Sequence, residues 1–268
     1  MNRVIFHGVR GSIACPGHSH QRYGGNTACV EIIVGETRLL FDAGTGIRAL
    51  GESLIESGAK IDLDIFLSHG HIDHLCGIPF FQPLFERDHR IRIHGPKDPK
   101  QLIGALMRQP LYPIKISEFR CNIRYSTLVP GQKLQVSPAL EIETLALDHP
   151  GGAMGYRLNA AGRKLVYASD FEHGNPDSEA RLIDFAKNAE ILIYDGMYDA
   201  REFERFKGFG HSTWQKGAEI AEAARAKTYV AFHHDPNHDD EKLDRIAGEL
   251  LKLNPRGLIA REGLTLSW

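Results

Sequence analysis

Four side chains that can bind a metal ion fall within six consecutive residues of the sequence. They are His69, His71, Asp73 and His74, in the segment His-Gly-His-Ile-Asp-His, and the apolar stretch 65–68 precedes them. If that stretch is a buried strand and the chain then enters a helix, the first two histidines can face one ion while Asp73 and His74 face a second. The alternative for this segment is a polar loop with chance histidines, but an ordered run of this kind is far more specific than a lone His-x-His pair.

Elements that can position this cluster follow one another along the chain, since short β-branched stretches alternate with stretches of helical periodicity. This pattern is typical of a layered α/β domain. The expected strands are 30–34, 38–41, 63–67, 91–94, 140–147, 155–158, 164–168, 191–194 and 228–232. The expected helices are 47–57, 75–85, 100–108, 178–189, 213–226 and 240–253, with Ser212 as the N-cap of the helix 213–226. No Pro/Ser-rich linker divides the chain, so we expect one domain over residues 1–268.

Composition excludes several classes of protein. Among 268 residues, 32 Lys and Arg against 34 Asp and Glu give a formal charge of -2, so no global basic field attracts nucleic acid or an anionic membrane, although a local basic patch stays open. No apolar run reaches the length of a signal peptide core or a membrane span, and we therefore expect a cytoplasmic protein without a membrane partner. The four cysteines are scattered without a C-x-x-C pair, which argues against a disulfide framework.

The segment 69–74, placed after an apolar strand, resembles the signature of the metallo-β-lactamase superfamily. The resemblance extends over nearly the whole chain, and it implies an α/β fold built as a four-layer αββα sandwich, with metal ions at the edge between the two sheets. It also implies that further ligands end later strands. On this basis His149 completes the first site with His69 and His71, and Asp170 bridges both ions. A loop histidine and a turn aspartate are the alternatives for these two residues.

The last ligand implied by the resemblance comes from the segment Phe-His-His-Asp-Pro at 232–236. Side chains alternate between the two faces of a strand, so only one of the two adjacent histidines is expected to point at the ions. Alignment with the family favours His233 over His234. We then expect His234, Asp235 or His238 to contact the metal-binding side chains, and His234 is also a candidate for a contact with substrate.

Two such sites would hold two divalent ions. The nitrogen and oxygen ligands favour zinc without excluding manganese or iron. A water molecule bridging two dications loses a proton near neutral pH and attacks an electrophile whose oxygens the ions polarise, with Asp73 at the catalytic edge. We expect a carboxylate to orient each ligating imidazole. Asp42 is the candidate for this role, and a cap at the start of the helix near residues 45–48 is the alternative.

Secondary motifs indicate the substrate, because the fold and the metals do not choose it. The segment Gly-His-Ser-Thr at 210–213 resembles that of ribonuclease Z-like and related phosphodiesterases, in which the histidine approaches the scissile phosphate. His211 would then donate a proton to the leaving oxygen or hold a phosphate oxygen. The alternative is a helix-capping segment with an incidental histidine.

The glycine-rich segments 8–12 and 22–27 resemble the opening of bacterial phosphodiesterase-like hydrolases. Arg10, Arg22 and Asn26 are candidates for contacts with phosphate or for shaping the cleft, with a purely structural role as the alternative. No long Gly/Pro-rich arm of the kind used by tRNA 3′-processing members is present in the sequence. We therefore expect a small cyclic or linear phosphodiester as substrate, and a nucleic acid is not favoured.

Three rival functions remain open at this point. The first is a hydrolase with the same metals that acts on a thioester, a lactone or a β-lactam. The second is a tRNA 3′-processing endonuclease, and the third is a catalytically silent metal-binding or sensor module. The segments 75–85 and 97–116 are candidates for a lid or for the surface of a homodimer.

Overall fold

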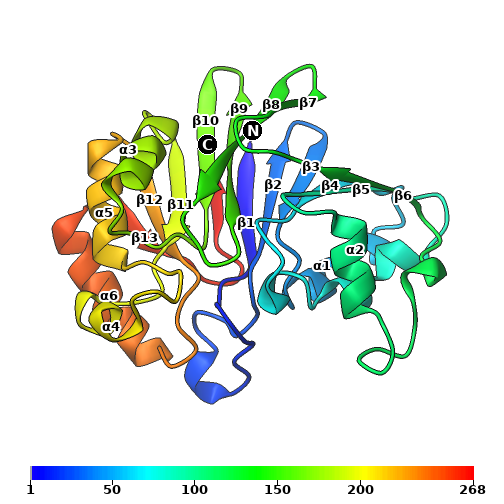
Figure 1. Cartoon of the computed structure of the whole chain (residues 1–268), viewed down its shortest axis with the longest axis horizontal. Helices are drawn as coiled ribbons and strands as arrows, with labels where there is room; N and C mark the ends of the chain where they lie inside the picture. Colours follow the sequence, from blue (N-terminus) through cyan, green and yellow to red (C-terminus); the bar gives the residue numbers. More distant parts are fainter. Residues whose placement is uncertain (1) are drawn as a thin grey trace.

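The structure, a computed structural model, describes residues 2–268 and contains two seven-stranded β-sheets packed face to face (Figure 1). The first sheet has the strand order β14-β1-β2-β3-β4-β5-β6, and the second has the order β13-β12-β11-β10-β9-β8-β7. The strands of the first sheet are β1 (Arg3–Gly8), β2 (Cys29–Val34), β3 (Thr37–Phe41), β4 (Asp62–Phe66), β5 (Arg90–Gly95), β6 (Asn122–Thr127) and β14 (Thr265–Ser267). The strands of the second are β7 (Lys133–Ser137), β8 (Leu140–Leu147), β9 (Ala153–Ala160), β10 (Arg163–Ala168), β11 (Ile191–Asp195), β12 (Thr228–Phe232) and β13 (Gly257–Ile259).

Helices cover the outer faces of both sheets and complete four layers (Figure 1). They are α1 (Ile47–Glu56), α2 (Pro99–Leu106), α3 (Pro176–Phe185), α4 (Ala200–Phe206), α5 (Trp214–Ala223) and α6 (Asp240–Leu253). Aromatic rings fill the core between the sheets; Phe41, for example, lies 5.4 Å from the rings of both Phe66 and Tyr156. The expected αββα sandwich is confirmed. None of the helices within residues 2–268 combines the length and the apolar character that a membrane crossing requires.

Parallel strands bring five chain segments to one edge of the sandwich. Strands β3 to β6 run parallel in the first sheet, and β10 to β13 run parallel in the second. Side chains at the carboxyl ends of parallel strands meet at the same edge, which is where open α/β sheets bind their ligands. The segments that end or follow β3, β4, β10, β11 and β12 carry Asp42, His69, Asp170, Asp195 and His233.

The nine expected strands all form. Their ends differ from the expected ends only within the usual uncertainty of strand assignment. Strands β1, β6, β7, β13 and β14 and helix α4 were not expected. β13 and β14 have three residues each, too few for a periodic pattern. β6 and β7 lie at sheet edges, and both alternate polar residues with apolar ones that are partly buried against the core. The period-2 signal of a half-buried strand was therefore present and was missed.

Two expectations about helices are wrong. Residues 75–85 form short 3-10 turns, Ile78–Phe80 and Gln82–Phe85, in place of one helix, because Pro79 and Pro83 lack the amide hydrogen that a continuing helix needs. Helix α5 begins one residue later than expected, with Thr213 as its N-cap accepting from the Lys216 amide at 3.0 Å. The hydroxyl of Ser212 instead lies 2.7 Å from the hydroxyl of Tyr194.

Candidate metal centre

Three residues at the common edge adopt a backbone conformation that side chains other than glycine rarely occupy. Asp42, Asp170 and His233 have φ values of 60°, 61° and 61°, each at or just after the end of a strand. Such left-handed residues cost about 1–3 kcal/mol each and cluster at functional sites, where the surrounding structure holds them. Here the sharp turn at each strand end directs the side chain inward, and all three side chains are buried.

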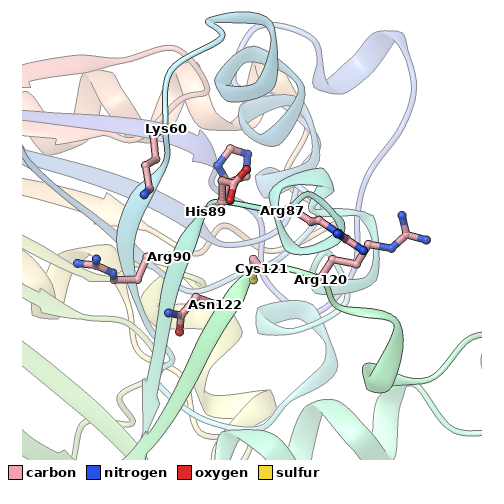
Figure 2. Close-up of a pocket in the computed structure, with 8 residues that line it drawn as sticks. Lys60, Arg87, His89, Arg90, Arg120, Cys121 and Asn122 are labelled. Carbon is pink, nitrogen blue, oxygen red and sulfur yellow. The ribbon is translucent and has the colours of Figure 1, made fainter.

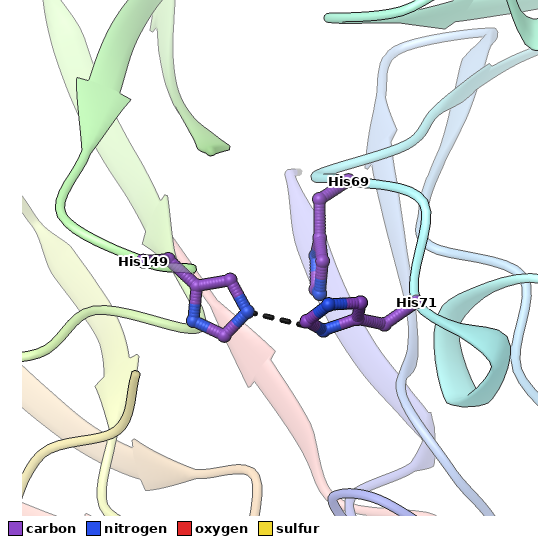
Figure 3. Close-up of side chains that lie close together, drawn as sticks. All are labelled: His69, His71 and His149. Atoms are coloured by element: carbon purple, nitrogen blue, oxygen red, sulfur yellow. Dashed lines mark hydrogen bonds between the residues drawn. The ribbon is translucent and has the colours of Figure 1, made fainter. Parts of the chain in front are cut away.

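A first group of three imidazoles converges from two segments (Figure 3). His69 and His71 come from the segment after β4, and His149 comes from the segment after β8. Nε2 of His149 lies 3.1 Å from Nδ1 of His71. On its other side, His149 donates its Nδ1–H to the carbonyl of Gly210 at 2.7 Å, which leaves Nε2 with a free lone pair. Burial lowers the pKa of His69 well below its ordinary value, so this imidazole is neutral and able to bind a metal.

A second group contains Asp73, His74 and His233. Nε2 of His233 lies 3.1 Å from Nε2 of His74 and 3.2 Å from Oδ2 of Asp73. The same Asp73 oxygen accepts the backbone amide of Ser12 at 2.8 Å, which fixes its orientation. The structure therefore brings together the three residues that the sequence suggested for a second ion.

Asp170 lies between the two groups. Its Oδ1 atom is 3.8 Å from Nε2 of His69, and its Oδ2 atom is 3.3 Å from Nε2 of His74 and 3.5 Å from Nε2 of His233. Each carboxylate oxygen thus faces a different group of imidazoles. This is the geometry that a bridging carboxylate requires.

Asp42 contacts His74 from the side away from the cluster. Its Oδ2 atom accepts from Nδ1 of His74 at 2.8 Å and from the hydroxyl of Tyr167 at 2.7 Å, and its Oδ1 atom accepts the amide of Ser68 at 2.7 Å. These bonds fix the ring so that Nε2 of His74 points at the cluster. The alternative role as a helix cap is not observed, because the residue before α1 is Gly46 and no side chain caps that helix.

The donor set fits divalent cations. Nε2 of His69 is buried and has no hydrogen-bond partner within residues 2–268, which costs about 1–3 kcal/mol unless something binds there. Burial lowers the pKa of His74, but Asp170, Asp73 and Asp42 outweigh it and raise the pKa well above its ordinary value. That shift reports a concentration of negative charge, which a cation at this position would neutralise.

Asp195 was missed as a site residue in the sequence. Its Oδ2 atom accepts from Nδ1 of His211 at 2.8 Å, and both residues are buried. Burial alone lowers the pKa of His211, but the charge of Asp195 outweighs it and raises the pKa to about 9. A signal was present, because strand β11 ends at Asp195 and a glycine follows it, just as Asp42 and two small residues follow strand β3.

The structure gives three expected substrate contacts other roles. The guanidinium of Arg10 is fully buried and donates to the carbonyls of Gly24 at 2.7 Å and His238 at 2.6 Å. His234 is buried with Nε2 2.8 Å from the carbonyl of Ala260, away from the cluster. Asn26 donates its side-chain amide to Glu262 at 3.0 Å. These contacts favour the structural role that the sequence left as the alternative, although Nη2 of Arg10 has no hydrogen-bond partner within residues 2–268. A contact of any of the three residues with substrate stays a prediction.

A profile of the β-lactamase superfamily domain matches residues 37–234, a span that contains every candidate metal ligand. The chain belongs to this superfamily. Among similar proteins, ribonuclease Z of Picrophilus torridus is 25% identical over 287 aligned positions, which cover 90% of this chain and 88% of that protein. The expectation of a hydrolase of this superfamily is confirmed.

Solved structures of other proteins have the same fold. YhfI, a metallo-β-lactamase fold protein from Bacillus subtilis, superposes with a TM-score of 0.74 at 20% identity and covers 100% of both chains. A diphosphatase from the PhnP family superposes with a TM-score of 0.72 at 17% identity, covering 100% of this chain and 98% of that one. At these identities the likeness establishes the fold alone.

A cationic depression of about 610 Å³ lies away from the candidate metal centre (Figure 2). Its basic residues include Lys60, Arg87, Arg90 and Arg120, which precede or begin β4, β5 and β6. These are the amino ends of the parallel strands, whereas the metal cluster lies at their carboxyl ends. The local basic patch that composition left open is therefore present, but on the edge opposite the cluster.

Proposed function

We propose that this protein is a dinuclear metal-dependent phosphodiesterase that hydrolyses a small cyclic or linear phosphodiester. One observation carries the proposal: His211, held by Asp195 at 2.8 Å, lies beside the cluster and adds a positioned imidazole to two complete ligand groups. Nδ1 of His211 is also 3.7 Å from Oδ1 of Asp170. A hydrolase of phosphodiesters needs an acid of this kind for the leaving oxygen.

Each ligand in the proposed centre has an assigned place. His69, His71 and His149 would hold the first ion, Asp73, His74 and His233 would hold the second, and the carboxylate of Asp170 would be shared between the two groups. Two divalent ions, zinc with manganese or iron as alternatives, would activate a water molecule and polarise the phosphate oxygens. Asp42 orients His74, and the carbonyl of Gly210 orients His149.

His211 acts on the leaving group in this proposal. Because its Nδ1–H donates to Asp195, Nε2 is the nitrogen left to meet a leaving or phosphate oxygen. The carboxylate of Asp195 is itself fixed by the backbone amides of Met197 at 3.1 Å and Ser212 at 3.3 Å. Asp195 is therefore a positioning residue, and His211 is the proposed catalytic acid.

Names of related proteins support phosphate chemistry. The relative from Picrophilus torridus is a ribonuclease Z, and the PhnP-family neighbour is a diphosphatase. The ribonuclease relative makes an RNA phosphodiester the second candidate. We favour a small substrate because the cationic depression that would attract a long polyanion lies on the edge opposite the cluster.

A substrate panel with metal-loaded protein tests the proposal. The panel contains bis-p-nitrophenyl phosphate, 2′,3′- and 3′,5′-cyclic nucleotides, a tRNA precursor, nitrocefin and S-lactoylglutathione. We expect turnover of at least one small phosphodiester at a kcat/KM well above that for nitrocefin or the thioester. Efficient hydrolysis of nitrocefin or the thioester with no phosphodiester turnover would overturn the proposal, and cleavage of the tRNA precursor alone would establish the second candidate.

A further inference from the structure

Phe209 is exposed although it lies two residues before the proposed catalytic acid. Its relative exposure is 62%, and it stands in the segment Gly208-Phe209-Gly210, in which both glycines have φ of 91°. Exposed aromatic side chains on mobile loops are ordinary. The surroundings of Phe209 show instead that this ring is held in place.

The carboxylate of Glu172 fixes the backbone on both sides of the ring. One oxygen accepts the amide of Gly208 at 2.7 Å, and the other accepts the amide of Gly210 at 2.6 Å. The carbonyl of Gly210 in turn accepts from His149, a proposed metal ligand. A side chain at position 210 would meet the His149 ring at 2.4 Å, so only glycine allows this close approach. The loop that presents Phe209 is thus part of the framework of the metal centre.

A row of aromatic rings connects the exposed ring to His211. The centroid of Phe209 is 5.6 Å from that of Phe206, which is 5.1 Å from the ring of Tyr198, and Tyr198 is 6.0 Å from the ring of His211. Contacts between aromatic rings contribute stabilisation beyond that of the apolar area they bury, and they favour particular ring orientations. They hold the exposed Phe209 ring in a defined relation to His211.

Two more exposed apolar side chains adjoin residues of the same centre. Ile13, 65% exposed, follows Ser12, whose amide binds Asp73. Ile72, 63% exposed, stands between the proposed ligands His71 and Asp73. Three separate segments next to the metal centre therefore each present an apolar side chain to solvent.

We propose that Phe209 is a stacking platform for a planar aromatic group of the substrate, so that the phosphodiester is one that carries a nucleobase. This inference rests on the proposed function and narrows its substrate class. Bases stack on exposed aromatic side chains with little dependence on sequence, because every base has a π-face. Ile13 and Ile72 offer apolar contact but no flat ring on which a base can stack. Of these three side chains, Phe209 is therefore the one that distinguishes a base from an aliphatic group.

Equilibrium binding tests the inference independently of turnover. Isothermal titration calorimetry of metal-loaded protein compares thymidine 5′-monophosphate with 2-deoxyribose 5-phosphate, which has the same phosphate and sugar without the base. We expect the wild type to bind the nucleotide with a Kd roughly 5- to 100-fold lower, the range for one stacked base. Phe209→Ala should abolish this preference and Phe209→Tyr should keep it. Leu253→Ala, which removes another exposed apolar side chain, 60% exposed at the end of α6, is the control and should change nothing.

Each outcome separates this inference from the function on which it rests. Equal Kd values for the two ligands in the wild type, or a preference that survives in Phe209→Ala, would overturn the inference even if bis-p-nitrophenyl phosphate is hydrolysed. A preference lost in Phe209→Ala without any phosphodiester turnover would contradict the proposed function alone. A change of oligomeric state in Phe209→Ala, with the preference intact, would show that the ring contacts a second copy and would also overturn the inference.

Discussion

The Oδ2 atom of Asp195 lies 2.8 Å from Nδ1 of His211, at the end of a buried strand of the second sheet. In the first sheet, Asp42 stands at the end of β3 with Oδ2 at 2.8 Å from Nδ1 of His74. The two halves of the sandwich therefore use the same device, a strand-end carboxylate that fixes one imidazole. In the proposed mechanism one of these imidazoles binds metal and the other meets the substrate.

Replacing His211 separates these two roles. In His211→Ala we expect metal content to stay at the wild-type value, while turnover of a phosphodiester with a poor leaving group falls roughly 10²- to 10⁴-fold, as for a lost general acid. A p-nitrophenyl ester needs less protonation and should lose less. Elemental analysis and steady-state kinetics on both esters measure this. Equal losses on the two esters, or a loss of metal, would contradict the assignment.

Replacing Asp195 tests whether it acts through His211. Asp195→Asn keeps the shape but removes the charge that raises the pKa of His211, so we expect kcat to fall roughly 10- to 100-fold, as when a partner of a site histidine is lost. The alkaline limb of the kcat profile, where an acid must stay protonated, should move to lower pH. In the double variant with His211→Ala the effect of Asp195→Asn should vanish. If the losses of kcat in the two single variants add in the double variant, Asp195 has a role that does not act through His211.

The cationic depression gives a negative prediction. Arg87 and Arg120 lie at the edge opposite the cluster, so the double variant Arg87→Gln/Arg120→Gln should hydrolyse a small phosphodiester with kcat/KM unchanged within about two-fold, as expected for distant, independent sites. Assays at low and moderate salt measure this. A large rise in KM for the small ester would place these arginines in the substrate path and contradict the arrangement proposed above.

A half-buried ion pair beyond the metal centre, between Glu202 and Lys242, sets an acid limit on stability. Burial raises the pKa of Glu202, but hydrogen bonds from His238 and Lys242 outweigh it and lower the pKa to about 2 from its ordinary value of 4.5. Because the folded-state pKa is the lower one, the stabilisation is fully present above about pH 4.5 and is lost as the pH falls toward 2. The difference in Tm between wild type and Glu202→Gln should therefore shrink between pH 6 and pH 3. Glu249→Gln, at an exposed glutamate, is the control and should show a small difference that does not follow this trend.

Most buried strands and the first four candidate ligands could be predicted from the sequence because both are encoded locally, whereas the αββα arrangement came from the resemblance to a known superfamily. Four potential ligands within residues 69–74 need only a strand before them to converge, and the buried strands of both sheets have clear apolar patterns. The resemblance to a known superfamily supplied the distant residues His149, Asp170 and His233. The structure places all of these side chains in one cluster.

The positions of Arg10 and His234 could not be predicted, because their environment comes from distant parts of the chain. The guanidinium of Arg10 donates to a carbonyl at residue 238, and His234 bonds a carbonyl at residue 260. Nothing in the local sequence distinguishes a cation that faces a substrate from one that satisfies buried carbonyls. Asp195 had a local signal, a strand ending at an aspartate, but its partner His211 lies beyond helix α4, which the sequence pattern did not reveal.

Metal content tests the central claim most directly. The protein is purified without chelator, reconstituted with zinc and freed of excess ion, and its metal is measured by elemental analysis beside Asp170→Asn, in which the proposed bridge loses its charge. We predict about two ions per chain for the wild type, from two ligand groups that share Asp170. We predict a clear loss of metal in the variant, because the anionic oxygen between the two cations is removed. One ion or none in the wild type, or two ions held equally well by Asp170→Asn, would contradict this claim.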